Sequence, residues 1–203
     1  MSQIALPLSL RKPEDPVRIV VGSGNQAVVD ALAEPSNWPY RTAILLGPPR
    51  SGKSLLGRWF AGEGLGDVIE GADRLDETEL FHRWNRAQEC EKPLLLISNR
   101  EGWEITLPDL KSRLGAALHL QIEPPDDLMV GALIESLAEQ RGLALGDGAP
   151  TYLKPRATRS YAGIEQLVAE IDRLSLERKV PATLAIWRAA LEAIEGPEQA
   201  RLL

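Results

Sequence analysis

The segment that most restricts the fold is a glycine-rich loop at residues 47–54, which reads Gly47-Pro48-Pro49-Arg50-Ser51-Gly52-Lys53-Ser54. An apolar run precedes this loop and a stretch with helical spacing follows it, so strand, loop and helix come in the order of a phosphate-binding P-loop. The glycines let the backbone turn its N–H groups towards phosphates, and the helix directs its positive end at the same anion. The sequence therefore predicts an α/β fold with a nucleotide site.

Two side chains of this loop have expected roles of their own. Lys53 is expected to reach the β- and γ-phosphates, and the Ser54 hydroxyl is expected to bind magnesium. The expected cofactor is ADP or ATP, with magnesium possible. The rest of the phosphate cradle is expected from Gly47, Pro48, Arg50, Ser51 and Gly52.

Apolar runs alternate with helical segments over the first part of the chain. Strands are expected at residues 42–46, 67–70, 94–97 and 117–122, and a β-like run at 18–21. Helices are expected at residues 26–34, with Asn25 as N-cap, and at 52–61, 77–91 and 107–114. This alternation predicts a parallel sheet with helices on both faces.

The pattern changes at Glu123-Pro124-Pro125, after which only helices are expected, at residues 126–141, 160–178 and 181–194. We therefore expect three parts: an extended tail at residues 1–16, a P-loop α/β subdomain at 17–124 and a small all-helical lid subdomain at 125–203.

The stretch from Lys53 to Glu70 is short for a fold of this kind. It must hold the helix after the loop, the return to the sheet and the next strand. A parallel crossover needs about a dozen or more residues, so one crossover fits and two do not. Since a P-loop domain of this type normally has two here, one strand–helix unit is expected to be missing.

Hydrolysis of the nucleotide would need a carboxylate for the magnesium and a group that orients the attacking water. Glu70, at the end of an apolar run, is the candidate magnesium ligand, and Asp73 is the alternative. Gly71 stands where a catalytic acid usually follows. An ordinary loop role for both acids also fits. Nucleotide binding is therefore expected, with the chain's own hydrolysis weak or absent.

Composition narrows the classes of partner. The net charge of −6 disfavours a protein that wraps nucleic acid, since such affinity comes from neutralising phosphates. The single cysteine, Cys90, permits no intrachain disulfide, which fits a reducing compartment. We find no apolar run of about 18 residues and no signal peptide, so we expect a cytoplasmic protein without membrane contact.

Several segments resemble the DnaA-related branch of the AAA+ ATPases, over essentially the whole chain. Residues 107–114, Leu-Pro-Asp-Leu-Lys-Ser-Arg-Leu, resemble the helix that carries the arginine finger in this family, with Arg113 in its place. Residues 94–100 resemble the strand that ends in sensor 1, which implies that Ser98 or Asn99 contacts the γ-phosphate or the attacking water. Residues 80–85 resemble the helix that follows the strand of the magnesium acid.

The resemblance also has a departure and a further implication. Ala162 stands where the family's sensor 2 arginine is expected, and Arg159 is the candidate to replace it, which again weakens the case for autonomous hydrolysis. The adenine is implied to lie near Val20 and Val21, beside the lid.

The N-terminal tail resembles the clamp-binding peptide of regulatory members of this branch. An extended apolar peptide can fill a hydrophobic groove while a glutamine makes polar contacts at its rim. The matching residues are Gln3, Ile4, Leu6, Pro7 and Leu8. Because the sequence ends at Leu203, where the initiator continues into a helix-turn-helix domain, we expect no sequence-specific DNA binding.

The resemblance implies a regulator that binds the DNA polymerase sliding clamp and lends Arg113 to ATP held by the replication initiator DnaA, with homo-oligomers possible. A nucleotide-independent scaffold with a degenerate P-loop fold, joining the clamp to a partner, is the alternative. A replication helper that loads other proteins or a small nucleotide kinase is a third possibility, but we find no arginine-rich acceptor site for a kinase.

Overall fold

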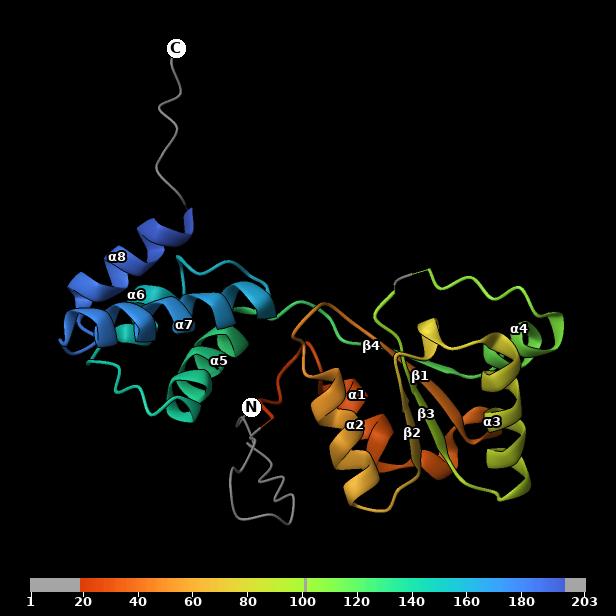
Figure 1. The fold of residues 1–203 in the computed structure, drawn as a ribbon. Helices are drawn as coiled ribbons and strands as arrows, with labels where there is room; N and C mark the ends of the chain where they lie inside the picture. The colour runs from red at the N-terminus through yellow and green to blue at the C-terminus, as the bar shows by residue number, and fades with distance from the viewer. Residues whose placement is uncertain (1–18, 101, 196–203) are drawn as a thin grey trace. The chain divides into compact units, whose positions relative to one another are not determined.

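The computed structural model describes residues 19–100 and 102–195, and the chain divides into two compact units between Glu123 and Pro124. The first unit is an α/β layer structure and the second is all-helical (Figure 1). The tail residues Gln3 to Leu8, where clamp binding is expected, lie outside the described residues.

A parallel sheet forms the centre of the first unit. Its strands are β1 (Thr42–Leu46), β2 (Asp67–Glu70), β3 (Leu94–Ile97) and β4 (Leu118–Gln121), in the spatial order β2-β3-β1-β4. All three strand pairs are parallel. The predicted parallel P-loop sheet is thus confirmed, and β1 lies between the strands that follow it in the chain.

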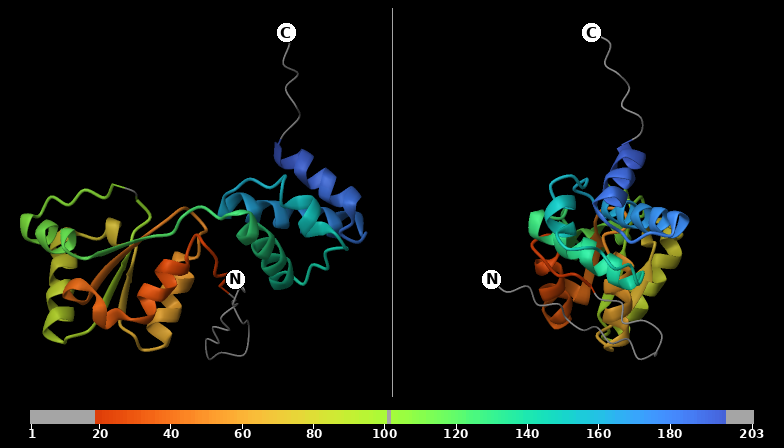
Figure 2. Two further views of the ribbon diagram at one scale, coloured as in Figure 1. Left: turned by 180° about the vertical axis from the view of Figure 1, so that it is seen from behind. Right: turned by 90° about the vertical axis from the view of Figure 1, so that its left-hand side faces the viewer.

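Helices cover both faces of this sheet, as the sequence predicts. α1 (Gln26–Ala33) and α2 (Lys53–Gly62) lie on one face, and α3 (Glu77–Glu89) and α4 (Pro108–Gly115) lie on the other (Figures 1 and 2). Every residue of β3 is buried, because apolar side chains project to both covered faces. The α3 side of the core joins Ile44 and Leu96 of the sheet to Leu80, Trp84 and Leu110 of the helices.

The connection between α2 and β2 confirms the missing strand–helix unit. Only α2 lies between the P-loop and β2, and four residues, 63–66, join the two elements. This short return brings the chain close to its neighbours at Gly66. A Cβ atom there would lie 2.4 Å from the carbonyl oxygen of Pro93 and 2.7 Å from the ring of Phe60. In the described sheet, β2 is therefore one of the two edge strands, and β4 is the other.

The segment before α1 differs from its prediction. Residues 19–21 do not form a strand, although Ile19 and Val21 are buried. Asn25 occupies the N-cap position of α1 but makes no side-chain capping bond. Its amide instead closes the preceding loop, since Oδ1 accepts from the Gly22 N–H at 2.9 Å and Nδ2 donates to the Val20 carbonyl at 2.9 Å.

Two 3₁₀ turns connect α1 to β1. They are η1 (Pro35–Asn37) and η2 (Pro39–Arg41), with a third, η3 (Ala72–Arg74), after β2. Between η1 and η2 the side chain of Trp38 is buried and stacks on Phe60 of α2 with the ring centroids 5.3 Å apart. This stack fixes the entry to β1 against the helix that follows the P-loop.

The second unit contains α5 (Asp127–Gln140), α6 (Ala149–Leu153), α7 (Tyr161–Arg178) and α8 (Leu184–Glu195). Asp126 and Ser160 cap α5 and α7 by accepting backbone N–H bonds. The short α6 was not predicted. The last helix begins later than predicted, because Ala182 forms an isolated bridge with Leu145 that keeps the chain extended before Leu184. In the part of the chain that the structure describes, no helix is long and apolar enough to cross a membrane.

Gly66→Ala tests the short return between α2 and β2. We expect a loss of about 1–3 kcal/mol of unfolding free energy, because a backbone oxygen and an aromatic ring must both move. Urea unfolding followed by tryptophan fluorescence measures the loss. Gly115→Ala is the matched control, since its Cβ would meet nothing within 4 Å, and a helical alanine is expected to be neutral or stabilising by up to about 1 kcal/mol. Equal midpoints for the two variants would contradict the crowding at Gly66.

Candidate functional site

Three predicted site segments follow three neighbouring parallel strands. The P-loop follows β1, Glu70 ends β2, and Ser98 and Asn99 follow β3. Because the carboxyl ends of parallel strands meet at one edge of the sheet, the topology gathers these residues at the edge where α/β folds bind ligands.

The backbone of the P-loop depends on its glycines. Gly52 has a φ of 88°, in the region that side chains rarely adopt. A Cβ at Gly47 would lie 2.8 Å from the Cβ of Ile122, so no larger residue fits there. Arg50 also has a positive φ, of 64°, and a non-glycine residue held this way is a form of strain that clusters at functional sites.

Lys53 is the first residue of α2 and its side chain is buried. Its Nζ donates to the carbonyl oxygens of Gly47 at 2.7 Å and Pro48 at 3.0 Å. Burial lowers the pKa of Lys53, and the Asp73 carboxylate acts in the opposite direction. A buried ammonium held only by carbonyls is poorly compensated, and a phosphate would supply the missing negative charge.

A second polar atom of the loop also suits an anion. Ser51 Oγ is buried and has no hydrogen-bond partner, which is rare for a buried hydroxyl. Together with the glycine backbone and Lys53, it makes residues 47–54 fit a bound phosphate group.

The two predicted magnesium ligands lie together. Ser54 Oγ donates to Glu70 Oε2 at 3.0 Å, so the hydroxyl and the carboxylate could bind one ion along with phosphate oxygens. Within residues 19–100 and 102–195, no group of three or more His, Cys, Asp or Glu side chains could hold a metal ion. A cation at Ser54 and Glu70 would therefore depend on the nucleotide for further ligands.

The position after Glu70, where a catalytic acid is expected, holds Gly71 in a left-handed backbone conformation. Gly71 has a φ of 64°, so a side chain at this position would be strained. Asp73, the alternative magnesium ligand, instead accepts the Asn99 N–H at 3.1 Å through Oδ1. Ser98 is buried, and its Oγ bonds both the N–H and the carbonyl of Arg100. Of the two sensor 1 candidates, Asn99 has the exposed side chain.

The residues expected to contact the adenine and the arginine expected to act as sensor 2 lie in separate units. Val20 has its carbonyl engaged by Asn25, and Val21 is buried in the first unit. Arg159, in the helical unit, precedes the N-cap of α7, so it lies outside the helix on which Ala162 stands. Its Nη2 lies 2.8 Å from Asp127 Oδ1, and both side chains are exposed. Such a pair contributes little, so another anion could replace the carboxylate.

Arg113 lies on α4 with its guanidinium over two rings of α3. The guanidinium carbon is 4.7 Å from the Phe81 ring centroid and 4.5 Å from that of Trp84. Its Nη1 donates to Asn85 Oδ1. Trp84 in turn donates from Nε1 to Thr42 Oγ1 at 3.1 Å, where β1 begins. The P-loop leaves the other end of β1, so Arg113 is held away from the chain's own phosphate loop.

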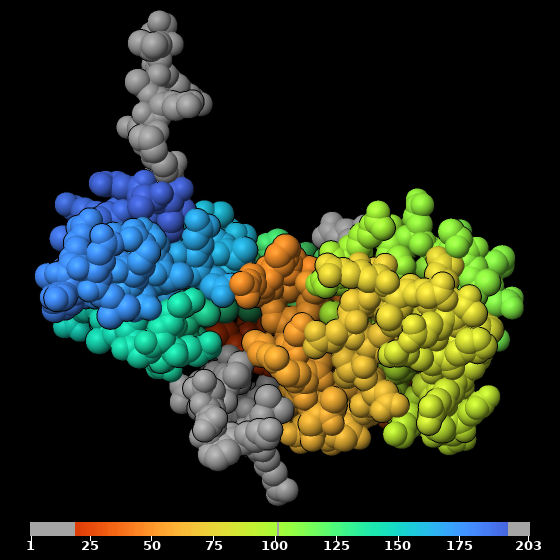
Figure 3. Space-filling view, in the orientation of Figure 1, coloured from red at the N-terminus to blue at the C-terminus, as the bar shows by residue number. Residues whose placement is uncertain are grey.

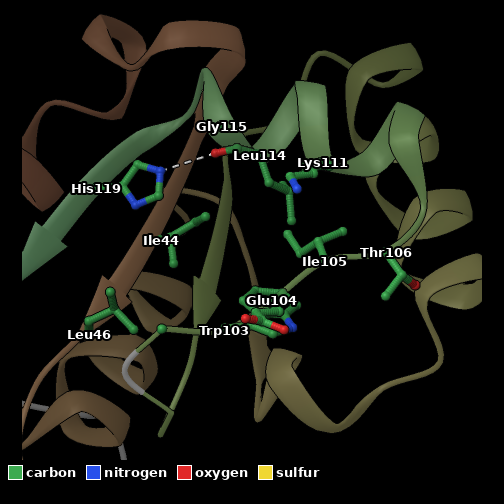
Figure 4. A pocket seen from close by; sticks show the side chains of 11 residues that line it. Ile44, Leu46, Trp103, Glu104, Ile105, Thr106, Lys111, Leu114, Gly115 and His119 are labelled. Atoms are coloured by element: carbon green, nitrogen blue, oxygen red, sulfur yellow. Dashed lines mark hydrogen bonds between the residues drawn. The ribbon is translucent and has the colours of Figure 1, made fainter.

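A pocket that the sequence did not predict lies over β1 and β4. It has a volume of about 960 Å³, and Ile44 and Leu46 of β1 lie on one side, opposite Trp103, Ile105 and Lys111 (Figure 4). His119 of β4 lines it too, with Nε2 3.1 Å from the Leu114 carbonyl. The pocket exists because α4, of eight residues, covers only part of this face. The shortness of the helical pattern at 107–114 is the one sequence feature that could have indicated this uncovered part of the sheet.

Sequence comparison finds that the chain is similar to initiator proteins of chromosome replication. The chain is 30% identical over 133 residues to the chromosomal replication initiator protein DnaA of Thermus thermophilus, and 27% identical over 123 residues to that of Symbiobacterium thermophilum. These matches cover 64% and 60% of this chain, but only 30% and 27% of the relatives. The chain thus spans less than a third of the curated relatives it matches. No family model matches it.

Solved structures share the fold. Domain III of the Thermotoga maritima replication initiation protein DnaA superposes with a TM-score of 0.73 at 17% identity, covering 88% of this chain and 95% of that one. The Thermotoga maritima RuvB Holliday junction branch migration motor gives 0.61 at 19% identity, covering 85% of this chain and 70% of RuvB. The fold is that of an AAA+ α/β layer followed by helices.

Lys53→Ala tests the phosphate site. We expect the affinity for ADP to fall about tenfold to a hundredfold, because hydrogen bonds to a charged group contribute roughly 1.5–3 kcal/mol. Equilibrium dialysis gives the dissociation constants. Lys111→Ala, on α4, is the control and should bind ADP like the unmodified chain. Equal affinities for all three proteins would rule out a phosphate contact by Lys53.

Proposed function

Because this chain is homologous to the AAA+ region of the replication initiator DnaA, we propose that it regulates replication initiation by stimulating ATP hydrolysis in DnaA. This role resembles that of Hda, the regulatory-inactivation factor of DnaA, and the chain would be a shortened variant of that factor. The protein docks on the DNA polymerase sliding clamp through residues 3–8 and offers Arg113 to ATP held by the initiator. DnaA then hydrolyses its ATP and becomes inactive, which limits re-initiation in the cytoplasm.

The observation that carries the proposal is the setting of Arg113. The guanidinium rests on Phe81 and Trp84, with Trp84 bonded to the start of β1, while the P-loop leaves its end. An arginine so placed is of no use to the chain's own nucleotide and suits a nucleotide on a neighbour. Such an arginine stabilises the charge that spreads over the γ-phosphate during transfer.

We propose that the chain binds ADP or ATP itself, with magnesium at Ser54 and Glu70, and hydrolyses ATP weakly or not at all. DnaA has been solved bound to AMPPCP and single-stranded DNA, and DnaA of Aquifex aeolicus bound to AMPPCP. The poorly compensated Lys53 and the Ser54–Glu70 contact support a nucleotide here too. Gly71 and Ala162, in place of an acid and an arginine, support weak hydrolysis.

The remaining site assignments belong to this proposal. Asn99 would act as sensor 1, Val20 and Val21 would contact the adenine, and Arg159 would meet the phosphates in place of the sensor 2 arginine. The chain would have no sequence-specific DNA contact and no membrane contact, and it could assemble with copies of itself. The three parts expected at residues 1–16, 17–124 and 125–203 would be the clamp tail, the nucleotide subdomain and the lid.

A nucleotide-independent scaffold that joins the clamp to a partner is the second candidate. One observation favours it: Lys53 bonds the carbonyls of its own loop at Gly47 and Pro48, which closes the loop without a ligand. ADP binding that depends on Lys53 would exclude this scaffold.

Arg113→Ala tests the proposed finger. We expect clamp-dependent stimulation of DnaA ATP hydrolysis to fall by at least about tenfold, since a finger in trans contributes 10³–10⁵ in well-studied cases. ADP binding by the variant should be unchanged. The control is Arg83→Ala, because Arg83 is an exposed arginine of α3 already paired with Glu79. Undiminished stimulation by Arg113→Ala would refute the finger.

Deletion of residues 1–9 tests the clamp tail. We expect comigration with the sliding clamp in gel filtration to disappear, because the apolar side chains and the glutamine of the peptide are removed together. The midpoint of thermal unfolding should be the same as for the full chain. Replacing Gln3, Leu6 and Leu8 together by alanine should have the same effect at full length. Clamp binding that survives both changes would show that the tail is not the docking peptide.

A further inference from the structure

We infer that one face of α3, formed by Glu77, Phe81, Trp84 and Asn85, positions Arg113 and leaves its positive charge free for a phosphate. These four residues are spaced so that they share a helical face. That this phosphate is the γ-phosphate of ATP on a partner rests on the proposed function. The positioning of Arg113 by α3 does not depend on the proposed function.

No carboxylate of the described residues compensates the charge of Arg113, in contrast to four other arginines of the chain. Arg41, Arg83, Arg159 and Arg173 each lie within 3.2 Å of a carboxylate oxygen. Arg113, by contrast, has no salt bridge to any of the described residues and contacts two neutral rings and one neutral amide. Neutral partners hold the guanidinium in place without cancelling its charge, so an incoming anion meets the full charge.

Donor groups of Arg113 remain available as well. A guanidinium has five N–H donors in a planar fork that matches phosphate oxygens. Within the described residues, only the bond from Nη1 to Asn85 uses one of them. Contact with the two rings and this single bond limits the rotamers of a long side chain, and part of the entropy cost of binding is thereby removed in advance.

The other end of α4 is tied to the same face of α3. The Glu77 carboxylate accepts the Thr106 N–H at 2.9 Å, the Thr106 hydroxyl at 2.8 Å and the Leu107 N–H at 2.6 Å. Leu107 is the N-cap residue of α4. These bonds, the backbone ones first, lower the pKa of Glu77, so it remains a carboxylate at neutral pH. α3 therefore fixes α4 at its start and near its end, and the two helices lie beside each other on one face of the molecule (Figure 3).

Asn85→Asp separates a positioning role from a merely structural one. The substitution keeps the shape of the side chain and strengthens its bond to Arg113, so a structural role predicts no loss. Our inference predicts that the new carboxylate compensates the charge and lowers the maximal stimulated rate of DnaA ATP hydrolysis by about tenfold or more. The concentration that gives half-maximal stimulation should change by less than about twofold, and the unfolding midpoint should not fall.

Phe81 provides a second pair of variants. Phe81→Leu keeps an apolar side chain but removes the ring, and we expect the maximal rate to fall about threefold to tenfold, as for loss of one cation–π contact. Phe81→Tyr keeps the ring and should retain the rate. Trp84 is left unchanged, because its bond to Thr42 belongs to the core. A higher rate with Phe81→Leu, or a normal rate with Asn85→Asp, would overturn the inference.

Chemical labelling tests the positioning without any partner. Phenylglyoxal reacts with arginine, and peptide mass spectrometry follows each site. Arg86, an exposed residue of α3, is the internal reference. Relative to Arg86, Arg113 should react at least about threefold faster in Phe81→Leu than in the unmodified chain. An unchanged ratio would refute the contact with Phe81. If the unmodified chain gives no stimulation of DnaA, the proposed function fails while the labelling still decides the positioning.

Discussion

The fold and its candidate site depend on the parallel pairing of β1 with β3 on one side and β4 on the other. At its carboxyl end, β1 leads into the P-loop beside the ends of β2 and β3, so Glu70 and Asn99 reach the same edge of the sheet. At its amino end, Thr42 bonds the indole of Trp84, on which Arg113 rests. One strand of five residues thus separates the cation that would hold the chain's own nucleotide from the one that would act on another.

Lys53 and Arg113 are held by different kinds of contact. Lys53 is buried, and its ammonium group donates to carbonyl oxygens of its own loop. Burial lowers the pKa of Lys53, and a bound phosphate would favour its charged form. Arg113 is held at the surface of α3 by groups that carry no charge. The first arrangement favours retention of a nucleotide, and the second favours contact with an anion that another molecule brings. Both arrangements agree with a protein whose P-loop serves regulation.

Much of the α/β unit could be predicted from the sequence. The bounds of β1, β2 and β3 were predicted correctly, because short apolar runs end at glycine, proline and polar residues that strands tolerate poorly. The strand predicted at 18–21 was wrong over its described part, since residues 19–21 pair with no strand although Ile19 and Val21 are buried. Helix α6 was missed because five residues with an early proline give no helical period. The contacts of Arg113 and the pocket of Figure 4 arise from pairs of elements far apart in the chain, which periodicity within one segment does not report.

The missing strand–helix unit has a consequence for the solubility of the protein. It leaves β2 at the border of the described sheet, with backbone groups that could pair with a strand of another molecule. The strand has only four residues, and both its ends carry exposed acids, Asp67 and Glu70. Asp67 is also paired with Lys92 across the start of β3. A border this short and this charged offers few pairing positions to a strand of another molecule, which works against edge-to-edge aggregation.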